Sequence, residues 1–313
     1  MAAQRWRGAA VVNRALQGGI HGRAGRRLVL GLPFLWLGIF FFAPFLIVLK
    51  VSFAEAILGN PPFGPLLEWV DGAFVQLRLN LDNYRLMLED SLYFGAFVNS
   101  IKVAAISTLL CLLLGYPMAY GIARARPSLR LPLLLLIILP FWTSFLIRVY
   151  AWIGILKNNG LINNLLLSTG IIDQPLALLH SPVAVYVGIV YSYLPFMILP
   201  LYATLVRMDL TLLEAAEDLG ARPFTAFLKV TLPLSLPGII AGSLLVFVPA
   251  TGEFVIPDLL GGPDSLMIGK VLWTEFFNNA DWPVASAMAV VLLLVLVFPV
   301  AWLQRGGWDE EER

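Results

Sequence analysis

Six long apolar segments, each with almost no charged residues, dominate this sequence. About 20 consecutive apolar residues are enough to cross a membrane as a helix, and only 13% of the chain is charged, against about 25% in soluble domains. Such segments favour membrane-spanning helices. The sequence therefore predicts an all-α polytopic membrane protein with six transmembrane helices at about residues 28–49, 97–123, 131–156, 182–205, 238–257 and 282–303, with a polar loop over residues 52–93.

The positive charges are divided unequally between the two sides of such a membrane domain. Six spans place both termini on one side, which carries fourteen of the Lys and Arg residues, whereas the other side carries six. Positively charged loops remain in the cytoplasm. We therefore expect a cytoplasmic tail over residues 1–27, a membrane domain over residues 28–303 and a cytoplasmic tail over residues 304–313.

A charged island, Leu212 to Pro237, separates the fourth and fifth apolar segments. Thr211 and Glu214 have the spacing of a capping box, in which each side chain bonds a backbone amide of the first helical turn. Gly220 stands where a helix ends in the left-handed conformation, and Pro223 follows three residues later. The pattern predicts a helix over residues 212–219, a sharp stop, and a second short helix towards residue 230.

Two ionisable residues inside the predicted spans stand out, Arg148 and Glu253. Charges within a membrane are costly and usually face a cavity or a partner group. One interpretation is structural: the two residues pair with each other or with loop groups and hold helices together. The other is functional: Glu253 faces a translocation path, at a helix break that Gly252 and Pro257 permit.

The loop after the fifth span combines acidic and aromatic residues. Such residues can bind an ammonium ligand, the acids through ion pairs and the aromatic rings through cation–π contacts. Exposed loop acids and aromatic residues of the membrane interface are the alternative explanation. With two aromatic residues near Arg148, the candidate residues of a substrate path are Glu253, Asp258, Tyr150, Trp152, Trp273, Glu275 and Asp281.

Several kinds of site have no pattern in this sequence. Cys111 is the only cysteine, and His21 and His180 are the only histidines, so no Cys/His metal spacing exists. No phosphate-binding loop is present, and no nucleophile stands with a base. We therefore expect a chain that is not an enzyme and binds neither ATP nor a metal by itself.

The charged island resembles the cytoplasmic coupling loop of ABC importer permeases. The resemblance rests on Glu214-Ala215-Ala216, on Gly220, and on Leu232–Pro233 thirteen residues after that glycine. Three further stretches, at residues 139–160, 193–205 and 252–273, are similar to the polyamine importer permeases of bacteria, most of all to putrescine permease subunits. The similarity covers about residues 28–303.

This resemblance implies a type I ABC importer permease fold in the bacterial inner membrane. It implies coupling through residues 207–237 to a cytoplasmic ATPase, with the contact residues Glu214, Ala215, Ala216, Gly220, Ala221 and Pro233. The implied partners are a second homologous permease, two copies of the ATPase, which holds ATP and Mg, and a periplasmic polyamine-binding protein. Putrescine and spermidine stay open as cargo, as do another small solute and a stand-alone secondary transporter. Nothing points to nucleic acid.

Overall fold

The computed structural model describes residues 23–70 and 74–311 and is predominantly helical, as predicted. The chain divides into two compact units. One contains residues up to 83 together with residues 282–290, and the other contains residues 84–281 and the chain from residue 291 onward. Two helices, α4 (Asp82–Glu89) and α16 (Trp282–Glu311), cross the boundary between the units. The predicted N-terminal tail lies almost entirely outside the described residues.

The first unit begins with one long apolar helix. It consists of α2 (Arg23–Leu37), a π-helical turn η1 (Gly38–Phe42) and α3 (Ala43–Ser52), which follow one another without a break. Large apolar side chains along it are exposed, as lipid contact requires. The first predicted span is thus a continuous helix.

A small hairpin follows, of strands β1 (Leu67–Val70) and β2 (Phe74–Leu77), which pair antiparallel. Leu67 lies opposite Leu77, and Val70 lies opposite Phe74. The prediction of a polar loop was wrong for this stretch. β-forming residues flank the turn dipeptide Asp71-Gly72, which is a hairpin signal.

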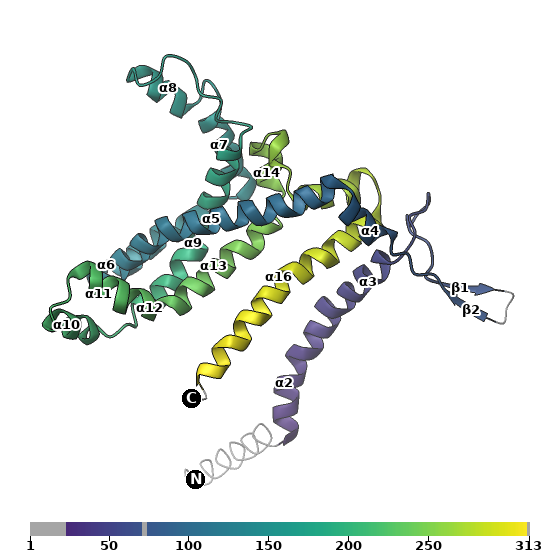
Figure 1. Ribbon diagram of the computed structural model, residues 1–313, viewed down its shortest axis with the longest axis horizontal. Coiled ribbons are helices and arrows are strands. Elements are labelled where there is room, and N and C mark those ends of the chain that lie inside the picture. The colour runs from purple at the N-terminus through teal and green to yellow at the C-terminus, as the bar shows by residue number, and fades with distance from the viewer. Residues whose placement is uncertain (1–22, 71–73, 312–313) are drawn as a thin grey trace, which may run out of the picture. The chain divides into compact units, whose positions relative to one another are not determined.

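Three helices form the centre of the second unit: α5 (Ser91–Arg124), α9 (Pro182–Leu205) and α13 (Leu236–Thr251), which pack side by side (Figure 1). A cluster of fully buried side chains between them includes Cys111, Met197, Ile198, Leu201 and Val246. Small residues let these helices approach closely. A Cβ atom on Gly242 would lie 2.8 Å from the Met197 sulfur and 3.0 Å from its carbonyl oxygen.

The third apolar segment is not one straight span, which corrects the prediction for residues 131–156. It forms α6 (Pro127–Ile138) and a 3₁₀ turn η2 (Leu139–Trp142), then bends by 90° into the helical stretch Phe145–Ser168, with α7 (Phe145–Leu156) and α8 (Leu161–Ser168). Pro140 lacks an amide hydrogen, and its carbonyl accepts a hydrogen bond from the Thr143 hydroxyl at 2.7 Å. These local bonds end the helix.

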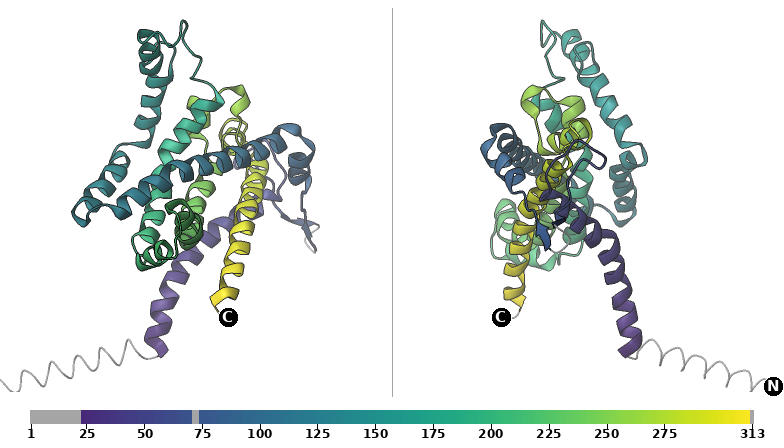
Figure 2. Two further views of the ribbon diagram at one scale, coloured as in Figure 1. Left: turned by 60° about the vertical axis from the view of Figure 1, so that its left-hand side comes forward. Right: turned by 90° about the vertical axis from the view of Figure 1, so that its right-hand side faces the viewer.

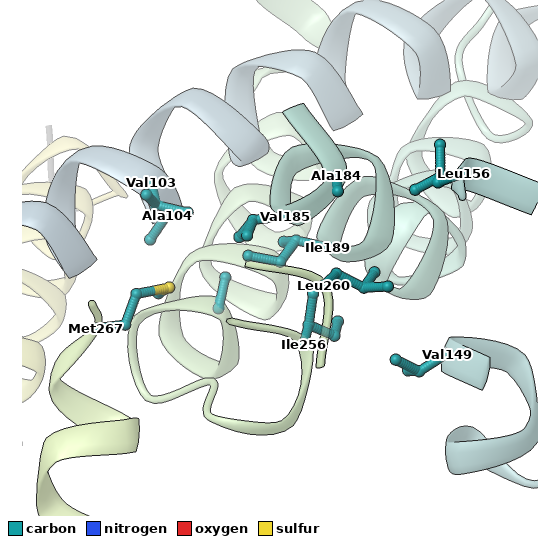
Figure 3. Packing of buried hydrophobic residues seen from close by; sticks show 11 residues of the cluster. Val103, Ala104, Val149, Leu156, Ala184, Val185, Ile189, Ile256, Leu260 and Met267 are labelled. Atoms are coloured by element: carbon teal, nitrogen blue, oxygen red, sulfur yellow. The ribbon is translucent and has the colours of Figure 1, made fainter. Parts of the chain in front are cut away.

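The fifth apolar segment also breaks, here at the place the sequence indicated. Helix α13 ends at Thr251, residues 252–254 are irregular, and α14 (Val255–Leu260) starts a new helix. The chain continues through η4 (Pro263–Ser265), α15 (Ile268–Trp273) and η5 (Thr274–Asn278). Side chains of α14 pack into a second buried cluster with α5, α7 and α9, in which Ile256 and Leu260 lie beside Ile189 (Figure 3).

The charged island forms α10 (Thr211–Asp218), α11 (Pro223–Ala226), a π-helical turn η3 (Phe227–Thr231) and α12 (Leu232–Leu234). A 64° bend separates it from α13. It lies at the end of α9 and α13 that is remote from α14, and the other two views show the same separation (Figure 2). The charged island and the helix break beside α14 therefore lie at opposite ends of the helix pair α9 and α13.

Three helices in the described residues are long and apolar enough to cross a membrane, Val29–Ser52, Ser91–Arg124 and Pro182–Leu205. The number rises to five if each bent pair counts as one span. A shorter apolar stretch, Trp282–Phe298, corresponds to the sixth predicted span. The count of six stays a prediction.

The close contact at Gly242 predicts a stability difference between two glycine substitutions. Gly242→Ala forces a methyl group against Met197 and should lower the free energy of unfolding by about 1–3 kcal/mol. Gly121→Ala in α5, where a Cβ meets nothing within 4 Å, should cost nothing or gain up to about 1 kcal/mol. Thermal unfolding of the detergent-solubilised protein measures both; equal melting temperatures would contradict the packing argument.

Candidate functional site

Helix α10 begins at Thr211, one residue earlier than predicted, and the capping box was wrong. The N-cap position is Leu210, which offers no side-chain bond. The carboxylate of Asp209 instead accepts from the Thr211 amide at 3.0 Å. Because Thr211 is itself inside the helix, its hydroxyl is not placed to cap the first turn.

The end of α10 is as predicted. Gly220 has a φ of +80°, and its amide donates to the Glu217 carbonyl at 2.8 Å, while the Ala221 amide donates to the Ala216 carbonyl at 3.0 Å. These two bonds form a Schellman motif, in which a left-handed residue lets the chain satisfy the last helical carbonyls. The turn fixes the direction in which α11 leaves.

The outer surface of this segment mixes apolar and acidic side chains. Leu219 is 89% exposed and Phe224 is 71% exposed, and Glu214, Glu217 and Asp218 are also exposed. An exposed apolar patch rimmed by polar residues is typical of an interaction surface.

The inner side of the segment is attached to α5. The Tyr116 hydroxyl lies 2.9 Å from the Ser235 hydroxyl, and its ring meets the Phe227 ring edge-on at a centroid distance of 5.6 Å. Thr231 is buried. These contacts were not predicted, because no sequence pattern links residues more than a hundred positions apart.

A cavity of about 440 Å³ lies where the two broken helices meet. Its lining comes from η2, α7, α9, α13, α14 and the break at residues 252–254. Irregular backbone at membrane depth is tolerated where it lines a cavity or is covered by protein. The lining residues are Phe141, Phe145, Arg148, Ser192, Tyr193, Phe196, Pro249, Gly252, Glu253, Phe254 and Val255.

Glu253 is 7% exposed, and its carboxylate is fully engaged. One oxygen accepts from the backbone amides of Phe254, Val255 and Ile256, at 3.2, 3.0 and 3.4 Å. The other accepts from the Tyr193 hydroxyl. Glu253 therefore satisfies the first amides of α14 and ties the break to α9.

Arg148 lies in the same cavity but makes a different set of contacts. Its guanidinium carbon is 4.9 Å from the centre of the Phe141 ring and 5.8 Å from that of Phe145. Its Nε and Nη1 atoms are buried without a hydrogen-bond partner. The interpretation that Arg148 pairs with Glu253 was wrong: within the described residues no ion pair joins them.

The other predicted path residues are spread over several places. Trp273 stacks on Phe254 behind the cavity wall, with centroids 4.7 Å apart and an interplanar angle of 8°. Trp152 packs edge-on against Tyr191 at 5.4 Å, and Tyr150 is 58% exposed. Neither residue belongs to the cavity lining.

The acidic residues after α13 also lie in several different places. Asp258 forms an ion pair with Lys270 at 3.1 Å. Glu275 is buried and accepts from the Tyr93 hydroxyl at 2.9 Å and from Asn279 at 2.8 Å, so the alternative of an exposed loop acid was wrong for it. The Asp281 amide donates to the Glu275 carbonyl at 2.9 Å. These contacts hold the segment together and lie away from the cavity lining.

The aromatic wall of the cavity was not identified from the sequence. Phe141, Phe145, Tyr193 and Phe196 come from segments whose aromatic residues look like ordinary membrane-core residues. Phe141 of η2 and Phe196 of α9 meet edge-on at 5.3 Å. In the described part of the chain, no group of His, Cys, Asp and Glu is placed to hold a metal ion.

Removing the Tyr193 hydroxyl tests the bond to Glu253. Tyr193→Phe leaves a buried carboxylate oxygen without its donor and should lower the free energy of unfolding by about 1.5–3 kcal/mol. Tyr186→Phe on the same helix is the matched control, since no hydrogen bond to its hydroxyl is found among the described residues; it should change stability by less than about 0.5 kcal/mol. Similar melting temperatures for the two variants would show that the Tyr193 bond is dispensable.

Comparison with known proteins agrees with this architecture. Residues 25–306 match the family described as binding-protein-dependent transport system inner membrane component. The spermidine/putrescine transport system permease protein PotB of Escherichia coli (strain K12) is 42% identical over 261 residues, covering 83% of this chain and 90% of PotB. PotB of Haemophilus influenzae is 41% identical over 276 residues, covering 87% and 92%.

A solved structure shows the same fold. The bacterial ABC transporter involved in the import of the acidic polysaccharide alginate contains a chain that superposes with a TM-score of 0.64 at 18% identity, over 90% of this chain and 96% of that one. The expected ABC importer permease fold is confirmed. The chain belongs to the family of inner-membrane permease components of binding-protein-dependent ABC importers.

Proposed function

We propose that this permease carries polyamines, with putrescine and spermidine as the first candidates, across the inner membrane. The observation that supports this most directly is the 42% identity, over most of both chains, to permeases named for spermidine and putrescine. The cavity is compatible with such a cargo, because a carboxylate among aromatic rings suits an ammonium group.

Transport in this proposal is driven by a partner ATPase that binds ATP and Mg, and not by this chain. The exposed surface of α10 and α11 is the docking site for that subunit, and both termini lie in the cytoplasm with it. The proposed contact residues are those of the family pattern, Glu214, Ala215, Ala216, Gly220, Ala221 and Pro233. The complete importer has a second homologous permease, two ATPase copies and a periplasmic polyamine-binding protein.

The proposed path for cargo passes the cavity between the two broken helices. Glu253 lines it, and Trp273 supports it through Phe254. Helix α13 joins the break at residues 252–254 to the docking segment, and its 16 residues span about 24 Å at ~1.5 Å per residue. A movement of α10 on the ATPase would reach the cavity through α12, the 64° bend after it and α13.

A reconstituted complex tests the cargo. The chain would be co-expressed with its genomic neighbours, and ATP hydrolysis measured with binding proteins loaded with putrescine or spermidine. We expect hydrolysis to rise several-fold with at least one loaded protein. An ATPase that co-purifies but responds only to another solute would move the cargo assignment to that solute. A chain that transports alone, without any ATPase, would be a secondary transporter.

The left-handed turn after α10 gives a second test, directed at coupling. Valine in a left-handed conformation costs about 1–2 kcal/mol, so Gly220→Val should distort the docking surface and reduce uptake at least fivefold, while membrane insertion stays normal. Gly220→Asn, which tolerates this conformation, should retain most of the uptake.

Gly170 provides the matched control for that variant. It also has a positive φ, +67°, and a Cβ atom on it would meet nothing within 4 Å, but it lies outside the docking segment. Gly170→Val carries the same backbone penalty and should leave uptake and the ATPase response unchanged. Normal uptake by Gly220→Val would remove the coupling role of this turn.

A further inference from the structure

The cavity between the broken helices already contains a cation. Among the described residues of its lining, only Arg148 and Glu253 are charged, so their formal charges balance. The guanidinium of Arg148 lies over the rings of Phe141 and Phe145. Aromatic faces and a nearby carboxylate are the groups that would recognise a cargo ammonium. Arg148 therefore lies in the place suited to the cargo.

Arg148 is held there by few interactions. Its Nε and Nη1 atoms are buried without hydrogen-bond partners, and no ion pair within the described residues anchors it to Glu253. Buried donors without acceptors are unfavourable, so cation–π contacts are the main attraction that opposes this cost. A side chain with four rotatable bonds and such weak attachment is able to leave the rings when another cation competes for them.

Glu253, in contrast, is fixed. Three backbone amides and the Tyr193 hydroxyl hold its carboxylate, and moving it would leave the start of α14 unsatisfied. The carboxylate of the cavity is thus held in one position, whereas the guanidinium sits on a long, weakly held side chain.

We propose that Arg148 is a tethered competitor for the cargo. This inference rests on the proposed polyamine cargo. In the empty cavity the guanidinium occupies the aromatic faces and balances Glu253. An entering ammonium group displaces it, because two cations in one low-dielectric cavity repel each other. When the guanidinium returns to Phe141 and Phe145, it expels the ammonium, so Arg148 keeps affinity low and promotes release.

This role predicts that removing the charge strengthens binding and slows transport at the same time. Arg148→Met replaces the charged side chain with an apolar one of similar length. The purified complex, without binding protein, should bind radiolabelled putrescine about tenfold more tightly than the wild type. Uptake into proteoliposomes with the loaded binding protein should turn over at least fivefold more slowly. Arg148→Lys keeps the charge and should stay within about threefold of the wild type in both assays.

Three controls make the result specific. Arg148→Gln carries the same expectation as Arg148→Met and replaces it if that variant does not assemble. Glu253→Gln should weaken putrescine binding at least tenfold, whereas Glu275→Gln, a buried carboxylate away from the cavity lining, should not. In Arg148→Ala complexes, added ethylguanidinium should restore the turnover, since the free cation takes the vacated place.

The outcomes separate this inference from the cargo assignment. Tighter binding with slower turnover in the uncharged variants supports the competitor role. Unchanged or weaker binding in a variant that assembles overturns it while leaving polyamine transport in place; weaker binding would make the guanidinium a ligand of the cargo. A wild-type complex that neither binds nor takes up putrescine or spermidine overturns both.

Discussion

The hydrogen bonds of Glu253 allow a helix to break in an apolar environment. Where α13 stops and α14 begins, backbone amides lose their helical acceptors, and there is no water in a bilayer core to replace them. One carboxylate oxygen accepts from three of these amides and the other from Tyr193. The break, the cavity beside it and the position of α14 against α9 all depend on this single side chain.

The second helix break, between η2 and α7, has a different cause and borders the same cavity. Between η2 and α7 the chain bends by 90°, at Thr143, whose hydroxyl donates to the carbonyl of Pro140 inside η2. The bend brings the Phe145 and Arg148 side chains of α7 beside Tyr193 and Phe196 of α9. Two breaks of independent origin thus enclose one space, while α9 and α13, packed against α5, extend from it to the charged island.

Much of this organisation could be predicted from local signals. The apolar segments indicated where the helices lie, and Gly220 indicated the end of α10, because glycine alone adopts a left-handed turn without strain. Gly252 and Pro257 indicated the break in the fifth segment. The glycine and proline signals around Glu214 also indicated that α10 is a short helix with a sharp stop. Local signals misled where a partner was non-local: Glu275 looked like an exposed loop acid, yet Tyr93, 182 positions away in sequence, makes it a buried acceptor.

The sequence by itself determined the class of the protein and the positions of its main helices, and it singled out Arg148 and Glu253 as charged residues inside the predicted spans. Hydrophobic length and turn chemistry are encoded in neighbouring residues. Tertiary structure decided what those charges do. Three of the four donors to the Glu253 carboxylate are amides one to three residues away in sequence. The fourth is the Tyr193 hydroxyl, which reaches the carboxylate only because α9 packs beside the break. That contact between residues 60 positions apart has no signature along the chain.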